Sequence, residues 1–445
     1  MNIGLPEKVK KIIAVIEAAG YEAYAVGGCI RDSILGRQPD DWDITTSASP
    51  LQVKGLFRRT VDTGIKHGTV TVLLEGEGFE VTTYRIDGEY EDSRHPKEVI
   101  FTSDIREDLR RRDFTINAMA YNDSRGLIDL FGGMEDIEKR VIRCVGVPQE
   151  RFGEDALRMM RALRFSAQLG YAVERGTQLA VRQMAGSLAN ISAERIQTEL
   201  VKLIVSPNPD CLRACYETGI TGVILPEFDV CMETEQHTPH HSYTVGEHIL
   251  QSMRKIEADK ALRLAMLFHD MGKPASRTTD EEGIDHFYQH AERGEAIAKQ
   301  ALRRLKFDND TIGRVSRLVL YHDYPLLPQP RSIRRAIHKI GEDIFPCLFA
   351  VKRADMLAQS GFQREEKKEL LAEAERVYRK IVEEKECVSL KTLAVGGKDL
   401  MGIGMAPGRE MGEMLKQLLD LVLEDPEENT RERLLGHARQ MRPDL

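Results

Sequence analysis

The sequence lacks the features that mark membrane and secreted proteins. No apolar run approaches the roughly 20 residues that a membrane-spanning helix needs. Residues 1–11 contain no apolar core of a signal peptide. We therefore expect a cytoplasmic protein without a membrane partner. No internal repeat or low-complexity segment stands out in the 445 residues.

Cysteine is scarce, and basic residues are not in excess. The seven cysteines are scattered and form no Cys-x-x-Cys pair, which excludes a disulfide framework or a thiolate zinc site as the basis of the fold. The formal net charge of −8 argues mildly against a nucleic-acid partner. A basic patch can still exist within an acidic chain, because phosphate binding depends on local charge.

Secondary-structure patterns divide the chain into an α/β head and a long helical remainder. Apolar and charged residues recur at helical spacing over residues 7–20. Beyond about residue 150 strand signals fade, and stretches rich in Leu, Ala, Arg, Glu and Met predict helices. The α+β class follows from this order. The head strands are predicted at residues 24–26, 42–46, 69–74 and 79–84, with a hairpin turn at 75–78.

Two carboxylates follow a glycine-rich turn in the predicted head. Gly27-Gly28-x-x-Arg31-Asp32 precedes Asp41-Trp42-Asp43. Side chains two apart on a strand point to the same face, and Mg²⁺ is usually held by one or two carboxylates plus substrate phosphates. An Asp-x-Asp alone is more often a solvated strand end. With the turn beside it, the pattern predicts Asp41 and Asp43 as Mg²⁺ ligands, and Gly28 and Arg31 as contacts to a nucleoside triphosphate.

A second motif is the segment Arg110-Arg111-Arg112-Asp113-Phe114-Thr115-Ile116-Asn117. The arginine run alone is typical of a basic helix start on the surface. In a nucleotide site, Arg112 would meet a phosphate, and Asp113 or Asn117 a ribose hydroxyl.

A third motif, Glu154-Asp155-x-x-Arg158, begins a predicted helix. The simplest interpretation is an intrahelical ion pair between Asp155 and Arg158, worth about 0.2–0.5 kcal/mol. The alternative is base reading, because a carboxylate accepts from an exocyclic amine and a guanidinium donates to ring acceptors. Such a pair would accept cytosine and adenine and reject uracil and guanine. Helical spacing lets Arg158 and Arg161 share a site, while Arg164 must lean to reach it.

In this order, the motifs resemble those of the class II tRNA nucleotidyltransferases, the CCA-adding enzymes, which share their head with bacterial poly(A) polymerases. The resemblance covers residues 20 to about 235. It implies a β-polymerase-like head that uses CTP and ATP to extend tRNA without a template, with Asp41 and Asp43 catalytic and Arg161 and Arg164 in support of the base-reading pair. The implied parts are a nucleotidyltransferase head (1–139), a helical neck with the base-reading helix (140–204), a helical RNA-binding body (205–236), a metal-binding domain described next (237–360) and a helical tail (361–445).

Residues 87–96 resemble the flexible loop that lets this family switch from C to A addition, and enzymes that add only CC tend to lack it. The loop favours full CCA addition, or A addition alone, over CC addition.

Histidine is concentrated in one region, since eight of the 12 histidines lie between residues 237 and 322. The order of His248, adjacent His269-Asp270 and Asp355 resembles the HD phosphohydrolase superfamily. The resemblance implies that His290 and His322 are the extra histidines of its two-metal members. This donor set suits Mn, Fe, Ni or Co. Bystander roles are expected for His237, His240, His241 and His286.

The sequence thus predicts a CCA tRNA nucleotidyltransferase, with phosphohydrolase activity of the HD domain as an addition. One alternative is an A-adding enzyme or poly(A) polymerase. Another is an HD phosphohydrolase with a degenerate RNA-binding head. The sequence does not predict the oligomeric state.

Overall fold

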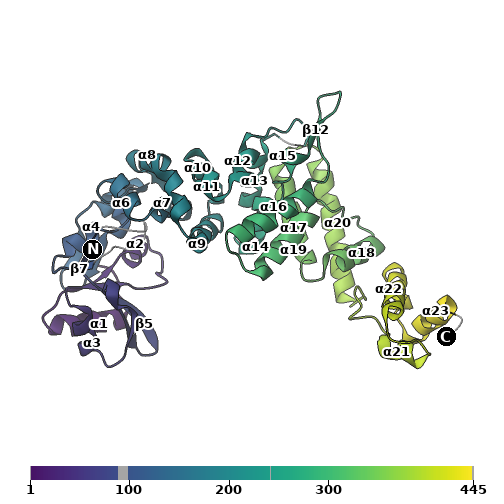
Figure 1. The fold of residues 1–445 in the computed structure, drawn as a ribbon, viewed down its shortest axis with the longest axis horizontal. Coiled ribbons are helices and arrows are strands. Elements are labelled where there is room, and N and C mark those ends of the chain that lie inside the picture. The colour runs from purple at the N-terminus through teal and green to yellow at the C-terminus, as the bar shows by residue number, and fades with distance from the viewer. Residues whose placement is uncertain (1, 89–98, 241, 443–445) are drawn as a thin grey trace. The chain divides into compact units, whose positions relative to one another are not determined.

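The computed structural model describes residues 2–88, 99–240 and 242–442 (Figure 1). They form two compact units, Met1–Asp229 and Val230–Leu445. Among the described helices, none combines the length and apolarity that crossing a bilayer requires. The five-part division predicted from the sequence is finer than these two units and stays a prediction.

The first unit is built on a seven-stranded sheet in the order β3-β4-β5-β2-β1-β8-β9. Neighbouring strands are antiparallel except β2 and β5, which run parallel. The predicted hairpin is confirmed as β4 and β5. The strands are β1 (Ala23–Val26), β2 (Ile44–Thr46), β3 (Thr60–Gly64), β4 (Thr69–Leu74), β5 (Glu77–Thr83), β8 (Met119–Asn122) and β9 (Gly126–Asp129).

Helices contact several strands of this sheet. The first helix, predicted at residues 7–20, is confirmed as α1 (Glu7–Ala18), which contacts β1 and buries Val9, Ile12 and Ile16. Tyr24 of β1 belongs to a buried hydrophobic cluster with Val26, Tyr84, Leu109 and Ala120. The other elements of the head are α2 (Gly28–Ile34), α3 (Pro50–Leu56), η1 (Ile65–His67), β6 (Arg85–Asp87), β7 (Val99–Phe101), α4 (Ile105–Arg110), η2 (Thr115–Asn117) and α5 (Gly133–Lys139).

Helices complete the first unit, and α7 packs along α9. Two short strands, β10 (Val141–Ile142) and β11 (Ala172–Val173), pair in parallel, so this segment is not entirely helical as the sequence predicts. The helices are α6 (Pro148–Glu154), α7 (Leu157–Leu169), α8 (Arg175–Met184), η3 (Ala185–Asn190), α9 (Ala193–Ile204), η4 (Pro209–Cys211), α10 (Leu212–Glu217), α11 (Ile220–Ile224) and α12 (Pro226–Glu233), the last of which runs into the second unit.

In its described residues, 230–240 and 242–442, the second unit is helical apart from one hairpin of β12 (Arg277–Thr279) and β13 (Asp285–Phe287), which was not predicted from the sequence. Helices α13, α14, α17 and α19 contact one another and form its core. Its helices are α13 (Val245–Lys255), α14 (Lys260–Phe268), α15 (Lys273–Ser276), α16 (His290–Arg304), α17 (Asn309–Tyr321), α18 (Pro330–Ile340), α19 (Phe345–Ala358), α20 (Arg364–Glu383), α21 (Gly397–Gly402), α22 (Arg409–Glu424), η5 (Pro426–Glu428) and α23 (Arg431–Met441).

Candidate active site and metal centre

The acidic pair lies at the start of β2, in the middle of the sheet. The strand begins at Ile44, later than predicted, so Asp41 and Asp43 occupy the irregular segment before it. The amide of Val26 in β1 donates to the carbonyl oxygen of Asp43 over 3.0 Å, which ties this segment to the sheet. The acidic pair therefore lies just outside β2, and its position is fixed by the hydrogen bond from β1.

Desolvation and neighbouring negative charge both raise the pKa of Asp43. Asp43 is exposed to solvent, yet enough protein surrounds its carboxylate that desolvation is the largest influence on its pKa. Arg112 opposes this effect, and the carboxylates of Asp41 and Glu80 add to it. The net result is a pKa raised to about 6. A divalent cation beside these carboxylates would offset their repulsion, so the donor set fits a hard cation such as Mg²⁺.

Glu80 is a candidate ligand that the sequence analysis missed. Strands β2 and β5 run parallel with Ile44 opposite Val81, so the preceding residues, Asp43 and Glu80, are neighbours. In β5, Phe79 and Val81 are buried and Glu80 between them is exposed. This alternation was visible in the sequence, but only the strand pairing brings Glu80 to Asp43.

The glycine turn and Arg112 meet at the same place. Gly27 has φ of +89°, a left-handed conformation that favours glycine, and a Cβ there would lie 2.9 Å from a terminal nitrogen of Arg112. Arg112 is also close enough to Asp43 to lower its pKa. The structure thus brings together the turn before Gly28, the acidic pair and one arginine of the second motif.

Arg31 is buried and joins the first motif to the second. It donates to both carboxylate oxygens of Asp32 over 3.0 and 2.8 Å and to the amide oxygen of Asn117 over 2.7 Å. Its guanidinium lies 4.8 Å from the ring centroid of Phe165 in α7. A phosphate contact by Arg31 stays a prediction.

Asp113 is buried, and protein donors surround it. Arg161 donates to one oxygen over 2.8 and 2.6 Å, while the other accepts from the amide of Phe114 over 2.9 Å and from Asn117 over 3.2 Å. Burial alone would raise the pKa of Asp113, but Arg161 and Arg158 outweigh it and hold the pKa at about 2. Asp113 therefore connects the head to α7 of the predicted neck through Arg161. Its contact with a ribose hydroxyl stays a prediction.

The prediction that Asp155 and Arg158 form an ion pair within one helix is wrong. Asp155 ends α6 with φ of −146° and ψ of 103°, so it stands between two helices and not within one. Its carboxylate accepts instead from Arg195 of α9. Arg158 pairs with Glu154 and donates to the carbonyl oxygen of Arg111 over 3.1 Å.

The remaining arginines of α7 bind separate acids. Arg161 pairs with Asp113, as described, and Arg164 lies 2.6 Å from Glu199 of α9. Desolvation lowers the pKa of Arg164 although Glu199 opposes it. Arg158, Arg161 and Arg164 therefore do not share one acceptor, although Arg31, Arg161 and Arg164 all lie near the ring of Phe165.

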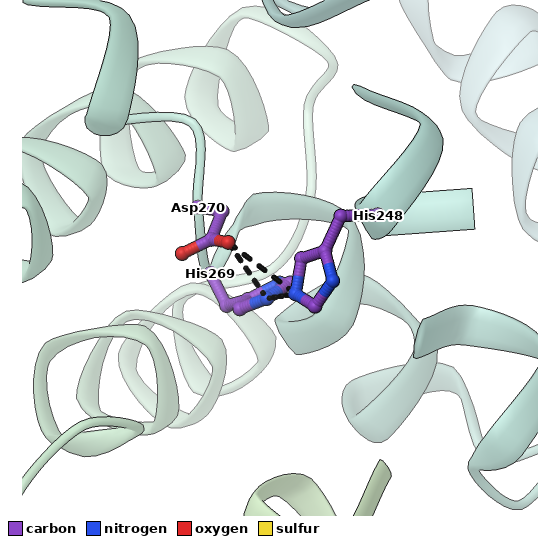
Figure 2. A group of neighbouring side chains, drawn as sticks. All are labelled: His248, His269 and Asp270. Carbon is purple, nitrogen blue, oxygen red and sulfur yellow. Dashed lines mark hydrogen bonds and ion pairs between the residues drawn. The ribbon is translucent and has the colours of Figure 1, made fainter. Parts of the chain in front are cut away.

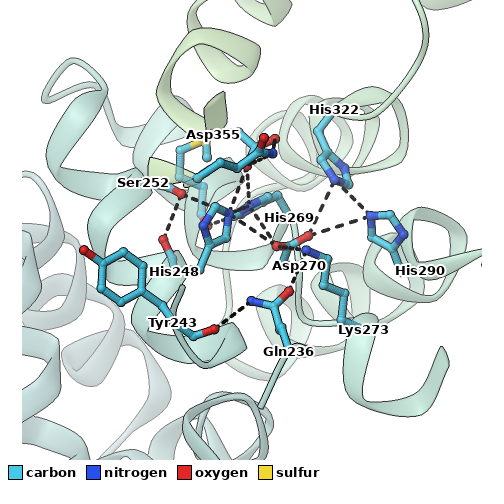
Figure 3. A network of polar contacts seen from close by, with 12 residues as sticks. Gln236, Tyr243, His248, Ser252, His269, Asp270, Lys273, His290, His322 and Asp355 are labelled. Atoms are coloured by element: carbon cyan, nitrogen blue, oxygen red, sulfur yellow. Dashed lines mark hydrogen bonds and ion pairs between the residues drawn. The ribbon is translucent and has the colours of Figure 1, made fainter. Parts of the chain in front are cut away.

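In the second unit, the structure brings together all six residues of the predicted metal site. His248 of α13 meets His269 and Asp270, which follow α14 (Figure 2). The donor atoms of this group lie within 4.8 Å of one another. Asp270, His290 and His322 form a second such group. Asp355 of α19 completes the first group, because its Oδ1 lies 2.9 Å from Nε2 of His248 (Figure 3).

The histidine tautomers suit metal binding. His269, His290 and His322 each place Nδ1 2.7 to 2.8 Å from the carbonyl oxygen three residues upstream. A carbonyl oxygen only accepts, so Nδ1 carries the proton and a neutral ring presents the lone pair of Nε2. The Nε2 atoms of His290 and His322 face each other at 3.2 Å. Two lone pairs that close repel each other, and a bound cation would offset this repulsion.

Asp270 stands between the two groups. One oxygen faces His248 and His269 at 3.4 Å, and the other faces His290 and His322 at 3.7 Å. Asp270 and Asp355 line an open cavity of about 1070 Å³ together with His290 and His322. Asp270, Asp355 and the four histidines would therefore suit the binding of transition-metal cations, and the cavity leaves room for a ligand.

The mixed sheet with acidic residues at the start of its central strand, followed by helices, is the architecture of a nucleotidyltransferase of the polymerase-head type. A model described as the poly A polymerase head domain matches residues 23–143. One described as a probable RNA- and SrmB-binding site of polymerase A matches 170–232, and one described as tRNA nucleotidyltransferase domain 2, putative, matches 276–438.

Comparisons over the whole chain show to which family of nucleotidyltransferases it belongs. The chain is 36% identical to the CCA-adding enzyme of Lactiplantibacillus plantarum, with 97% of this chain and 96% of that one covered. It is also 36% identical to the CCA-adding enzyme of Enterococcus faecalis, with 98% and 97% covered. The crystal structure of the Bacillus stearothermophilus CCA-adding enzyme in complex with CTP is similar with a TM-score of 0.72, 30% identity and 98% of each chain covered. The chain belongs to the CCA-adding enzymes, as the motifs predicted.

Proposed function

We propose that this chain builds the CCA end of tRNA from CTP and ATP without a nucleic-acid template. The observation that carries the proposal is the proximity of Asp41, Glu80 and Arg112 to Asp43 at the start of β2, with Gly27 beside Arg112, in a chain of this family. The Bacillus stearothermophilus relative, solved with CTP, supports the nucleotide class. The models for RNA-binding and tRNA nucleotidyltransferase segments support the acceptor.

In the proposed reaction, the 3′-hydroxyl of the RNA attacks the α-phosphate and pyrophosphate leaves. Asp41, Asp43 and Glu80 would hold Mg²⁺, which supplies charge neutralisation and lowers the pKa of the attacking hydroxyl when bound. Arg112, beside the glycine turn, offers positive charge for the phosphates. Asp155 and Arg158 would select the base by accepting from its amine and donating to its ring nitrogen.

An extension assay tests the product. The enzyme is incubated with tRNA lacking CCA and with tRNA ending in CC, using labelled CTP and ATP. Full CCA addition requires two C and one A on the first substrate and one A on the second. Addition of A only to the second substrate would indicate an A-adding enzyme, and long A tracts a poly(A) polymerase. The predicted switching loop, residues 87–96, lies outside the described residues except for Asp87 and Gly88, so this assay must decide.

We also propose that the histidine cluster of the second unit is an HD-type metal centre that hydrolyses phosphate esters. The convergence of His248, His269 and Asp355 on one point, with His290 and His322 on another, favours it. Mn, Fe, Ni or Co would suit this donor set. A bound pair of such ions would activate water for attack on phosphorus.

Phosphatase assays with 2′,3′-cyclic nucleotides and a simple phosphomonoester test this activity in the presence of each metal. No hydrolysis with any of the four ions would limit the centre to a structural role. If hydrolysis occurred and wild-type protein added no nucleotide, the HD phosphohydrolase with a degenerate head would be the better description. A cytoplasmic location remains a prediction from the sequence.

A further inference from the structure

Asp155, the proposed base-reading carboxylate, is held by a residue that no sequence motif identified. Arg195 donates to Oδ1 of Asp155 over 3.2 Å and to Oδ2 over 2.7 Å. The amide of Leu157 also donates to Oδ1, over 3.1 Å. This paired contact is the fork geometry with which a guanidinium fixes the plane of a carboxylate.

The hydrogen bonds leave a defined part of the carboxylate for a ligand. Two carboxylate oxygens offer about four acceptor positions. Arg195 and Leu157 occupy both positions on Oδ1, and Arg195 occupies one on Oδ2. The remaining acceptor is on Oδ2, and its direction is set by the guanidinium. A single directed acceptor is what recognition of one exocyclic amine needs.

Helix packing fixes Arg195 itself. It stands in the first turn of α9, which packs along α7, the helix that begins just after Asp155. One helical turn further on, Glu199 of α9 pairs with Arg164 of α7 over 2.6 Å, and both side chains are buried. The side chains of Asp155 and Arg195 are only 17% and 23% exposed, so solvent competes weakly for their contact. The orientation of Asp155 is therefore tied to the α7–α9 interface.

We propose that Arg195 is a positioning residue that determines nucleotide specificity by orienting Asp155 toward the amine of cytosine or adenine. The inference rests on the proposed function, in which Asp155 reads the base. Without Arg195 the carboxylate can rotate, and its bond to the amine weakens. Uracil and guanine, which present a carbonyl at that position, lose less because they never made this bond.

Loss of Arg195 should therefore reduce the discrimination between correct and incorrect nucleotides, and not only the rate of addition. A hydrogen bond to a charged group contributes enough that losing its alignment changes relative rates by about 10- to 100-fold. We expect the ratio of kcat/KM for CTP to that for UTP, and for ATP to that for GTP, to fall by this factor in Arg195→Ala. A purely structural role would lower kcat/KM for all four nucleotides together and leave both ratios unchanged.

The experiment measures kcat/KM for the four nucleotides on tRNA lacking CCA and on tRNA ending in CC. The variants are Arg195→Ala, Arg195→Lys and Asp155→Ala. Arg195→Lys keeps the charge and most of the stem but loses the fork, so its ratios should fall in the same direction even if Arg195→Ala does not fold. Lys202→Gln is the matched control, because it removes one positive charge from an exposed position on the same helix. Its ratios should stay at the wild-type values.

Two results would overturn the proposal in different ways. If Asp155→Ala loses discrimination while Arg195→Lys and any folded Arg195→Ala protein keep it within threefold of wild type, Arg195 does not position the carboxylate. If Asp155→Ala itself keeps discrimination, or the wild-type protein adds neither C nor A, the proposed function fails and this inference fails with it. Added guanidinium at millimolar concentration should partly restore the ratios of Arg195→Ala and leave those of Asp155→Ala unchanged.

Discussion

Replacing Asp113 with asparagine tests whether this buried carboxylate joins head and neck. In the wild-type protein its oxygens accept from Arg161 of α7, from the amide of Phe114 and from Asn117. Asparagine keeps the shape and one acceptor oxygen, but it removes the negative charge that faces Arg161. The change therefore isolates the charge from the packing.

The pKa of Asp113 gives the size of the effect. Its pKa falls from the usual 3.8 to about 2 in the folded protein, although burial alone would raise it. At 1.36 kcal/mol per unit, ionised Asp113 contributes about 2 kcal/mol to the free energy of unfolding at pH 7. Because the folded pKa is depressed, this contribution is present above about pH 4 and is lost as the pH falls through 2. It should fall to roughly half by pH 3.

Urea unfolding followed by tryptophan fluorescence measures this directly. Trp42 is the only tryptophan in the sequence and adjoins the acidic pair, so its emission reports the head. Asp113→Asn should lower the free energy of unfolding by about 2 kcal/mol at pH 7 and by about half of that at pH 3. Asp123→Asn is the control, since Asp123 makes a surface contact with Lys10 at 3.4 Å, and such pairs contribute about 0–1 kcal/mol.

An unchanged unfolding midpoint for Asp113→Asn at pH 7 would refute the assigned role. An equal destabilisation at pH 7 and pH 3 would refute the electrostatic explanation, because it would show that lost packing and not lost charge is responsible.

Three further predictions concern the two metal sites. Asp41→Ala should lower nucleotide addition by about 10²–10³-fold or more with an unchanged circular dichroism spectrum, and retained incorporation of labelled CTP would contradict its role. Because the pKa of Asp43 is about 6, protons should compete with Mg²⁺ below that pH. The Mg²⁺ concentration for half-maximal activity should rise about tenfold per pH unit below 6, and a flat dependence between pH 7 and 5 would argue against Asp43 as a ligand. His269→Ala should lose bound transition metal by mass spectrometry, whereas His286→Ala, which changes an exposed histidine paired with Asp280, should retain it.

Local sequence patterns predicted the elements whose signals lie within a few residues. Alternating apolar residues and a turn over residues 69–83 predicted the β4–β5 hairpin, because the side-chain period of a strand is two. The helical period predicted α1. Glycines followed by paired aspartates predicted the glycine turn beside the acidic pair. Adjacent His269-Asp270 after an apolar helix predicted a cluster that the structure assembles from α13, α16 and α19 and from the segments after α14 and α17.

Partners distant in sequence were not predictable in the same way. The base-reading pair was expected on one helix, yet a break after α6 separates Asp155 from Arg158 and turns each toward a different partner. Arg195 lies 40 residues away from Asp155 and belongs to no motif beside it. The three-dimensional packing of α7 on α9 decides which arginine meets which acid.

The chemistry of this protein was thus determined by its sequence, because carboxylates, glycines, arginines and histidines appear there at spacings that suit nucleotidyl transfer and metal binding. Only the tertiary structure places Glu80 beside Asp43, through the parallel pairing of β2 and β5. It also brings Arg195 of α9 into contact with Asp155 at the end of α6. The reason is physical. Chain neighbours share a local backbone conformation that their residue types reveal, whereas contacts between distant segments depend on how the strands register and the helices pack.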